Sequence, residues 1–192
     1  MSLESIANYL ENHQLTNELF DRTNRSNRLI LKGASYTAKS LITTSLAKKA
    51  SKKLLVIVPT LEDATRWYSL IKDCGWSKTC LYPTSEVSPY DSIQVTSEII
   101  WGQLQVLSDI FELNEDENIA IIATEISLQP HLPPFQYLKD RCIKLSVGDE
   151  INLTKLSVKL SECGYVKTNN IDQEGTWTRR GDILDIYPVS SE

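Results

Sequence analysis

Two short, continuous apolar runs constrain the fold of this chain more than any other feature. One is LLVIV at residues 54–58, and the other is IAIIA at residues 119–123. Apolar runs of this length without alternation are typical of strands that are buried on both faces of a parallel sheet. Segments with helical patterns lie between these runs, so the sequence predicts an α/β fold with a doubly wound parallel sheet.

Three helices and two further strands complete this pattern. A helix rich in Ala, Leu and Lys is expected over residues 38–50. Thr60 is expected to cap a second helix that runs to about Lys72, with Asp63 in its first turn. A third helix has apolar residues at i, i+4, i+7 and i+11, namely Ile100, Leu104, Leu107 and Phe111. Residues 28–31 and 78–81 are predicted to be the further strands.

The pattern changes after the His-Leu-Pro-Pro segment at residues 131–134. Residues 141–147 alternate like a strand, and Asn152 can cap a helix that Gly164 ends. Short strands are then expected at residues 165–168, 176–180 and 183–187. We therefore predict an α/β domain over residues 1–140 and a small α+β module over 141–192. A single hairpin on one helix buries little surface, so we expect this module to be cut short.

Composition excludes several classes of function. The net charge is −5, which argues against the whole chain being a nonspecific nucleic-acid binder but leaves room for a local basic patch. No apolar run approaches the roughly 18 residues that span a membrane, and the polar N-terminus predicts no signal peptide. The cysteines form no C-x-x-C pair, so no metal site is predicted, and they fit a reducing cytoplasm. These cysteines are Cys74, Cys80, Cys142 and Cys163.

The stretch GASYTAKS at residues 33–40 resembles a nucleotide phosphate loop, G-x-x-x-x-G-K-[ST]. Gly33, Lys39 and Ser40 match, but Ala38 stands where the second glycine belongs. A Cβ at that position obstructs the backbone approach to phosphate, and the run at 119–123 is followed by Thr-Glu rather than an Asp-Glu pair for the metal. Two interpretations stay open: residual nucleotide binding, or a turn that keeps an ancestral shape.

The segment WTRRGDILDIYP at residues 177–188 is the second notable motif. Arginine and tryptophan are favoured anchors at protein interfaces, because they combine apolar area with directional hydrogen bonds. Asp185 lies inside an apolar strand and needs a partner, for which Arg180 across the turn is the nearest candidate. The motif is therefore either an interface anchor or a structural Arg–Asp pair. No Ser/His/Asp or Cys/His arrangement is present, so no catalytic residues are predicted.

Four segments carry a resemblance to a known family. They are residues 29–33, 54–59, 89–92 and 175–188, of which the last is the most specific because Arg-Gly precedes an apolar strand that contains Asp and ends in aromatic-Pro. On these residues the chain resembles the N-terminal part of bacterial transcription-repair coupling factor and the related module of UvrB, a component of the excision nuclease. The resemblance implies a degenerate helicase-like domain at 1–140. It also implies that 141–192 is the start of the UvrB-like module that binds UvrA, the damage-recognition component of the same nuclease.

The resemblance also implies a function in DNA repair. A coupling factor is an ATP-driven DNA translocase that displaces stalled RNA polymerase and recruits UvrA for nucleotide excision repair. It acts in the cytoplasm. Its N-terminal part has no working ATPase, so no cofactor is expected in this chain, and ATP with Mg²⁺ belongs to the motor. RNA polymerase and duplex DNA would contact parts of the parent outside this chain, and no membrane partner is implied.

The family motif carries over to particular residues. Arg180 and Gly181 match its Arg-Gly, Lys167 lies near another basic family position, and Arg179 is an extra basic residue beside the motif. These four are the predicted contacts with UvrA. GASYTAKS is closer to a working phosphate loop than the family usually has. Alternatives are therefore a nucleotide-binding domain with residual ATPase activity, and a module that binds damaged DNA directly.

Overall fold

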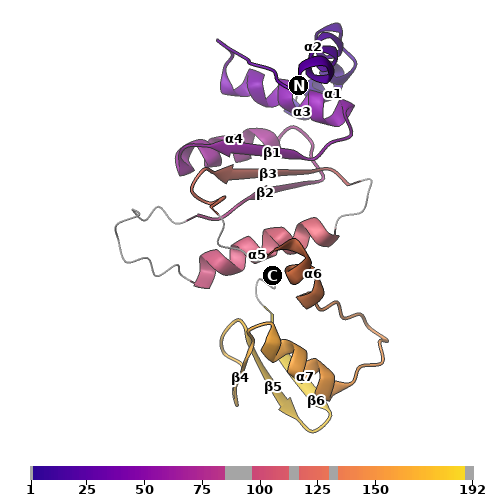
Figure 1. Ribbon diagram of the computed structural model, residues 1–192, viewed down its shortest axis with the longest axis vertical. Helices are drawn as coiled ribbons and strands as arrows, with labels where there is room; N and C mark the ends of the chain where they lie inside the picture. Colours follow the sequence, from indigo (N-terminus) through magenta and orange to yellow (C-terminus); the bar gives the residue numbers. More distant parts are fainter. Residues whose placement is uncertain (1, 85–96, 113–116, 130–133, 189–192) are drawn as a thin grey trace. The chain divides into compact units, whose positions relative to one another are not determined.

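The computed structural model describes residues 2–84, 97–112, 117–129 and 134–188 (Figure 1). The chain divides into two compact units, Met1–Gln129 and Pro130–Glu192. The assignment of residues 1–140 to a helicase-like domain and of 141–192 to a partner-binding module stays a prediction. Each unit is built around its own sheet and its own core.

The first unit contains a parallel sheet of three described strands, β1 (Leu54–Val58), β2 (Lys78–Leu81) and β3 (Ile119–Thr124). Their order is β1-β3-β2. The two apolar runs of the sequence lie side by side, with Leu54 opposite Ala120 and Val58 opposite Thr124. The mixed α/β class with a parallel sheet is therefore confirmed.

Five helices accompany this sheet in the described part of the unit, and three of them were predicted. Two of these three begin close to the expected residues, because Ser35 accepts a hydrogen bond from the amide of Ala38 and Thr60 accepts one from Asp63. α4 lies on one side of the sheet and α5 on the other (Figure 1). The helices are α1 (Leu3–Glu11), α2 (Gln14–Ser26), α3 (Tyr36–Lys49), α4 (Leu61–Lys72) and α5 (Ser97–Glu112).

The main core of the first unit lies between the sheet and the helices α1, α3 and α4. Ala64, Ile71 and Ile122 are completely buried there. Trp76 is also buried, and its indole Nε1 donates a hydrogen bond of 3.1 Å to Oγ1 of Thr44. Burial of one large aliphatic side chain is worth about 1.5–3 kcal/mol, so these few contacts hold the helical layer to the sheet.

The other face of the sheet is unevenly covered. Over β2, the carboxylate of Asp109 from α5 lies 2.7 Å from the ammonium of Lys78. Over β1, Leu55 and Ile57 remain 51% and 55% exposed. β1 is also an edge strand among the described residues. A run that the sequence marks as buried on both faces thus has one open face and one unpaired edge.

Two expectations for the first unit need correction. Residues 28–31 do not form a strand: no strand of the described sheet pairs with them, and Ile30 is 60% exposed. The helices α1 and α2 were not predicted at all. Helical spacing of Leu3, Ile6 and Ala7 was the available signal for α1, which buries Ala7 against α3.

The second unit packs one helix on a small mixed sheet. α7 (Leu153–Glu162) begins at the cap Asn152 and is followed by Gly164 with a positive φ of 91°, as predicted. β4 (Val166–Lys167) is parallel to β5 (Thr176–Arg180), which is antiparallel to β6 (Ile183–Tyr187). Leu156 and Leu160 of α7 pack against Trp177 of β5. The predicted helix and short strands are confirmed.

The predicted strand over residues 141–147 is wrong. Arg141 ends a helix that was not predicted, α6 (Phe135–Arg141), and residues 142–147 pair with no described strand. Ile143 packs against the core of this unit, whereas Val147 is fully exposed. The alternation of residues 142–147 therefore reflects an unpaired extended segment with one side packed on the core, and not a strand of a sheet.

Neither a membrane-spanning helix nor a metal-binding group is found among the described residues. Within them, no helix is both long enough and apolar enough to cross a membrane. The same residues contain no group of three or more His, Cys, Asp and Glu side chains arranged to hold a metal ion.

Candidate partner-binding surface

The β5–β6 hairpin places successive side chains on opposite faces of the small sheet. Trp177 and Arg179 share the face that α7 covers, because Trp177 packs on α7 and alternate residues of a strand share a face. Thr178 and Arg180 lie on the opposite face, where Thr178 is paired with Asp185 and Arg180 with Ile183. Arg179 and Arg180 therefore lie on opposite faces of the sheet and make different contacts.

Arg180 is a strongly exposed member of the predicted site. Its Nη2 lies 3.6 Å from Oδ2 of Asp185, so the Arg–Asp pair anticipated in the sequence does form. The side chains are 74% and 46% exposed. Exposed ion pairs of this kind contribute about 0–1 kcal/mol to stability. Arg180 therefore keeps donors available for a partner while Asp185 holds it over this face.

Arg179 is held by its own unit. Its Nε donates a hydrogen bond of 2.9 Å to the carbonyl of Gly181, and its Nη1 lies 3.4 Å from Oγ1 of Thr154. Gly181 has a φ of 64°, a left-handed conformation in which a Cβ would be strained. Arg179 and Gly181 therefore shape the turn and connect it to the first turn of α7.

Lys167 extends across the face that carries Arg179. It is paired with Trp177 in the sheet, and its Nζ lies 5.5 Å from the centroid of the Trp177 ring. A cation at this distance from an indole face is attracted by the ring quadrupole. The four predicted residues thus do not form one cluster: Arg180 lies on one face of the sheet, and Lys167 and Arg179 lie on the other.

Ile183 is a candidate contact that sequence reasoning missed. It is the sheet partner of Arg180 and is 64% exposed, so an apolar side chain and a guanidinium lie side by side on the outer face. Val166, on the same face of β4, is 61% exposed. Apolar area next to arginine is the composition of an interface core. The period of the strand was the available signal, because it places Ile183 with Asp185 rather than with Leu184.

The phosphate-loop residues are arranged for packing and not for holding a metal. Ser40 is completely buried, and its hydroxyl donates a hydrogen bond of 2.9 Å to the carbonyl of Thr37. In a phosphate loop this hydroxyl must reach Mg²⁺. The amide of Ala38, which a phosphate would need, is bonded to the Ser35 hydroxyl. These residues do not fit a bound Mg-nucleotide.

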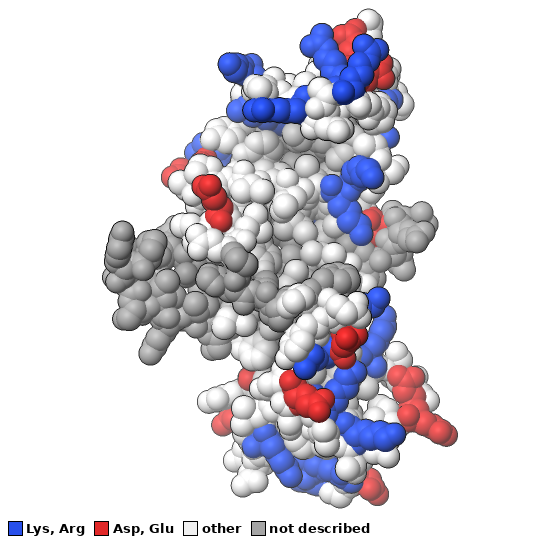
Figure 2. Space-filling view, viewed as in Figure 1, with Lys and Arg blue, Asp and Glu red and all other residues white. Residues whose placement is uncertain are grey.

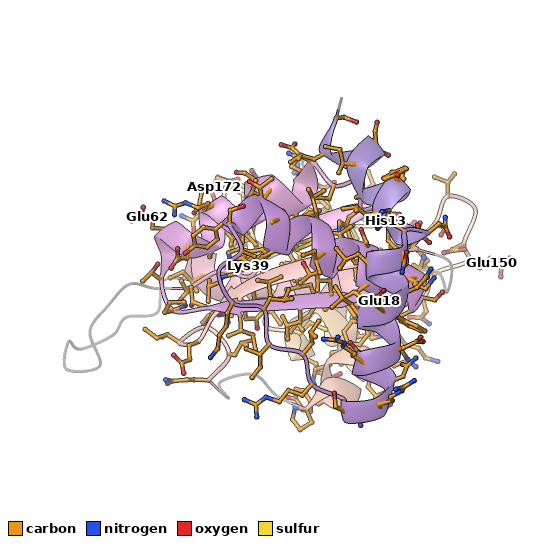
Figure 3. All side chains as sticks on the ribbon, turned by 90° about the horizontal axis from the view of Figure 1, so that it is seen from above. His13, Glu18, Lys39, Glu62, Glu150 and Asp172 are labelled. Carbon is orange, nitrogen blue, oxygen red and sulfur yellow. The ribbon has the colours of Figure 1, made fainter. Side chains whose placement is uncertain are left out.

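Tyr36 occupies the space beside the first turn of α3. Its hydroxyl donates a hydrogen bond of 3.0 Å to Oδ1 of Asp63, which raises the pKa of the tyrosine, and the negative charge of Asp63 raises this pKa further. The ring packs edge-on against Trp67, and the guanidinium of Arg66 lies 5.1 Å from its centroid. Lys39, which is labelled in Figure 3, lies with its Nζ 5.8 Å from the same ring. Tyr36 thus connects α3 to α4, which is a structural role.

Comparison with known proteins shows that the second unit is similar to a class of interaction domain. Residues 143–192 match the family model of the UvrB interaction domain. The match covers α7 and the whole mixed sheet, including Arg180 and Ile183. The resemblance that the hairpin motif suggested is therefore confirmed for this part of the chain.

Most of the chain is similar to bacterial transcription-repair-coupling factors and to UvrABC system protein B. It is 28% identical over 167 residues to the transcription-repair-coupling factor of Bacillus subtilis, a match that covers 85% of this chain and 14% of that protein. The coupling factor of Escherichia coli is 22% identical over 81% of this chain and 13% of its own length. UvrABC system protein B of Staphylococcus aureus is 28% identical over 84% of this chain and 26% of its own length. The chain thus spans about a seventh of the coupling factors that it matches.

Proposed function

We propose that this chain is the N-terminal portion of a transcription-repair coupling factor and recruits UvrA, the damage-recognition component of the excision nuclease. The observation that carries this proposal is the match of residues 143–192 to the UvrB interaction domain, together with an exposed Arg180 and Ile183 on that unit. Arg180 would make charge-assisted hydrogen bonds to carboxylates of UvrA, and Ile183 would supply apolar contact.

The remaining parts of the proposal concern the parent protein. We infer that the first unit is a degenerate helicase-like domain with a doubly wound sheet, supported by its parallel strand order β1-β3-β2 and its likeness to coupling factors. The ATP-driven translocase and the contacts with RNA polymerase would lie outside this chain. The site of action would be the cytoplasm.

The proposal predicts a specific effect of charge reversal at the hairpin. We expect Arg180→Glu to weaken binding of purified UvrA to this chain about tenfold or more, because the change replaces an attraction to carboxylates by a repulsion. Isothermal titration calorimetry or biolayer interferometry measures the change directly. Circular dichroism of the variant should match that of the parent chain, since the pair that is lost is exposed.

Two control variants separate docking from folding. Lys144→Glu makes the same charge reversal at another exposed residue of the second unit and should leave binding unchanged. Asp185→Asn removes the ionic partner of Arg180 and should preserve binding or strengthen it. Equal affinity of Arg180→Glu and the parent chain would show that Arg180 serves only the pair with Asp185. Loss of binding in Lys144→Glu as well would indicate a nonspecific charge effect.

A second expectation concerns the GASYTAKS loop. We propose that it is a structural turn, so Mg-ATP at millimolar concentration should not raise the unfolding temperature of the chain. The buried Ser40 hydroxyl and the capped amide of Ala38 support this proposal. Differential scanning fluorimetry provides the measurement. A rise in the unfolding temperature that Lys39→Ala abolishes would establish the rival function, a nucleotide-binding domain.

A further inference from the structure

Positive charge is segregated in the first unit. Nine of the chain's 20 Lys and Arg residues lie between residues 22 and 61, and that stretch contains none of its 25 Asp and Glu residues. The stretch covers the end of α2, the segment that leads to α3, α3 itself and β1. An acidic chain with a net charge of −5 therefore has one strongly cationic part.

Three of these nine cations serve the fold. Lys48 donates hydrogen bonds to the side chain of Asn8 and to the carbonyl of Cys74. Lys49 lies over the ring of Phe20, and Lys39 lies over that of Tyr36. The contacts of Lys48 and Lys49 hold α3 against its neighbours, whereas Lys39 and Tyr36 both lie on α3 itself.

The other six cations are exposed and have no carboxylate partner among the described residues. The three ion pairs found in the described part of the chain all involve other residues. We call the six the cationic surface residues. They are Arg22, Arg25, Arg28, Lys32, Lys52 and Lys53.

Arg22, Arg25 and Arg28 form the densest part of this set. They follow one another at intervals of three residues, so Arg22 and Arg25 are neighbours on the last turns of α2 and Arg28 comes just beyond the left-handed cap Asn27. α2 packs on α3. Lys and Arg side chains are prominent over these helices in Figure 2, with some Asp and Glu side chains among them. Arg22 and Arg25 thus lie on a helix that packs on α3, and Arg28 follows directly after its cap.

The composition of this region favours a polyanion over a protein or a membrane. Between residues 22 and 53 the exposed large apolar residues are Ile30 and Tyr36, which are too few for the apolar core of a protein interface. In α2, Leu19 is buried and Leu15 is 43% exposed, which offers little apolar surface for insertion into a bilayer. Guanidinium groups match phosphate oxygens in a bidentate geometry. Exposed amides such as Asn24 are also common contacts of nucleic-acid backbones.

We propose that the cationic surface residues bind the phosphate backbone of duplex DNA without sequence preference. This activity would belong to the first unit and is independent of the recruitment proposed for the second. It would give the chain a DNA contact of its own, in addition to any made by a motor outside it.

The test is fluorescence anisotropy of a labelled duplex oligonucleotide of arbitrary sequence with the intact chain, in salt from about 50 to 200 mM. The variant carries Arg22→Gln, Arg25→Gln and Arg28→Gln together. We expect its affinity at low salt to fall about tenfold or more, and the slope of log K against log salt to become shallower by about 0.9 for each lost phosphate contact. Glutamine is a good helix former, so α2 should keep its helicity.

Two matched variants test whether charge at this place is the cause. Lys139→Gln, Lys144→Gln and Lys155→Gln together remove the same charge from exposed positions of the second unit and should leave affinity nearly unchanged. Replacement of the three arginines by lysine keeps the charge and should retain most of the binding.

Several results would overturn the proposal. One is the absence of DNA binding by the parent chain at low salt. Another is equal weakening by the two glutamine triples, which would show that only overall charge matters. Binding to phosphatidylserine vesicles or to polyglutamate, with no binding to the duplex, would assign the surface to a different partner.

Discussion

Replacement of Trp177 by alanine should unfold the second unit. The indole is 4% exposed and packs on Leu156 and Leu160, so the substitution removes the largest side chain of that core. Loss of a buried aromatic residue costs about 3–5 kcal/mol, and a unit of this size rarely has more stability than that. Hydrogen exchange of amides in residues 153–187 should become fast, while exchange in the sheet of the first unit stays slow.

Trp177→Phe provides the matched control. The indole Nε1 of Trp177 is buried and has no hydrogen-bond partner among the described residues. A phenylalanine keeps most of the apolar volume and removes this unsatisfied donor, so the two effects should nearly cancel, within about 1 kcal/mol. If the phenylalanine variant loses as much protection as the alanine variant, the indole N–H has a partner and the proposed packing of this core is wrong.

The second large effect is expected at the centre of the parallel sheet. Ile122 is completely buried and is flanked by Val56 on one neighbouring strand and by Leu81 on the other. Ile122→Ala should lower the free energy of unfolding of the first unit by about 2–5 kcal/mol, because it leaves a cavity that rigid neighbours cannot fill. Urea denaturation followed by the fluorescence of Trp67 and Trp76, which are buried in the same core, measures the change.

The same sheet offers a control with the same chemistry. Ile57 of β1 is 55% exposed, so Ile57→Ala removes the same atoms from a site that is largely in water. Its cost should be less than about 1 kcal/mol. Similar costs for the two substitutions would contradict the assignment of the covered and open faces of the sheet.

The elements that the sequence predicted well are those with strong local signals. The runs at 54–58 and 119–123 became adjacent strands because five successive apolar side chains leave no polar face for a helix or a loop. Thr60 and Asn152 cap their helices as expected, since a side-chain oxygen at that position accepts a hydrogen bond from a free amide.

The failures arose where a local pattern needed a distant partner. Residues 28–31 and 141–147 have the composition of strands, but a strand exists only when a neighbour accepts its hydrogen bonds, and no described strand does so. The sequence also predicted only part of the candidate partner-binding surface. The pair of Arg180 with Asp185 follows from a two-residue turn, and strand alternation places Arg179 and Arg180 on opposite faces. Which of the two faces α7 covers does not follow from either pattern. That choice is tertiary and leaves no local trace.

The open flank of β1 has a consequence for the chain in solution. Its backbone edge is unpaired among the described strands, and Leu55 and Ile57 beside it are exposed. Another extended peptide can pair with such an edge, because the added strand forms backbone hydrogen bonds and also buries apolar surface. Natural sequences usually flank such a strand with charged or proline residues that limit this, and here exposed Lys52 and Lys53 precede LLVIV and Pro59 follows it. Whether concentrated preparations of the chain stay in solution should therefore depend on these few flanking residues more than on its overall charge.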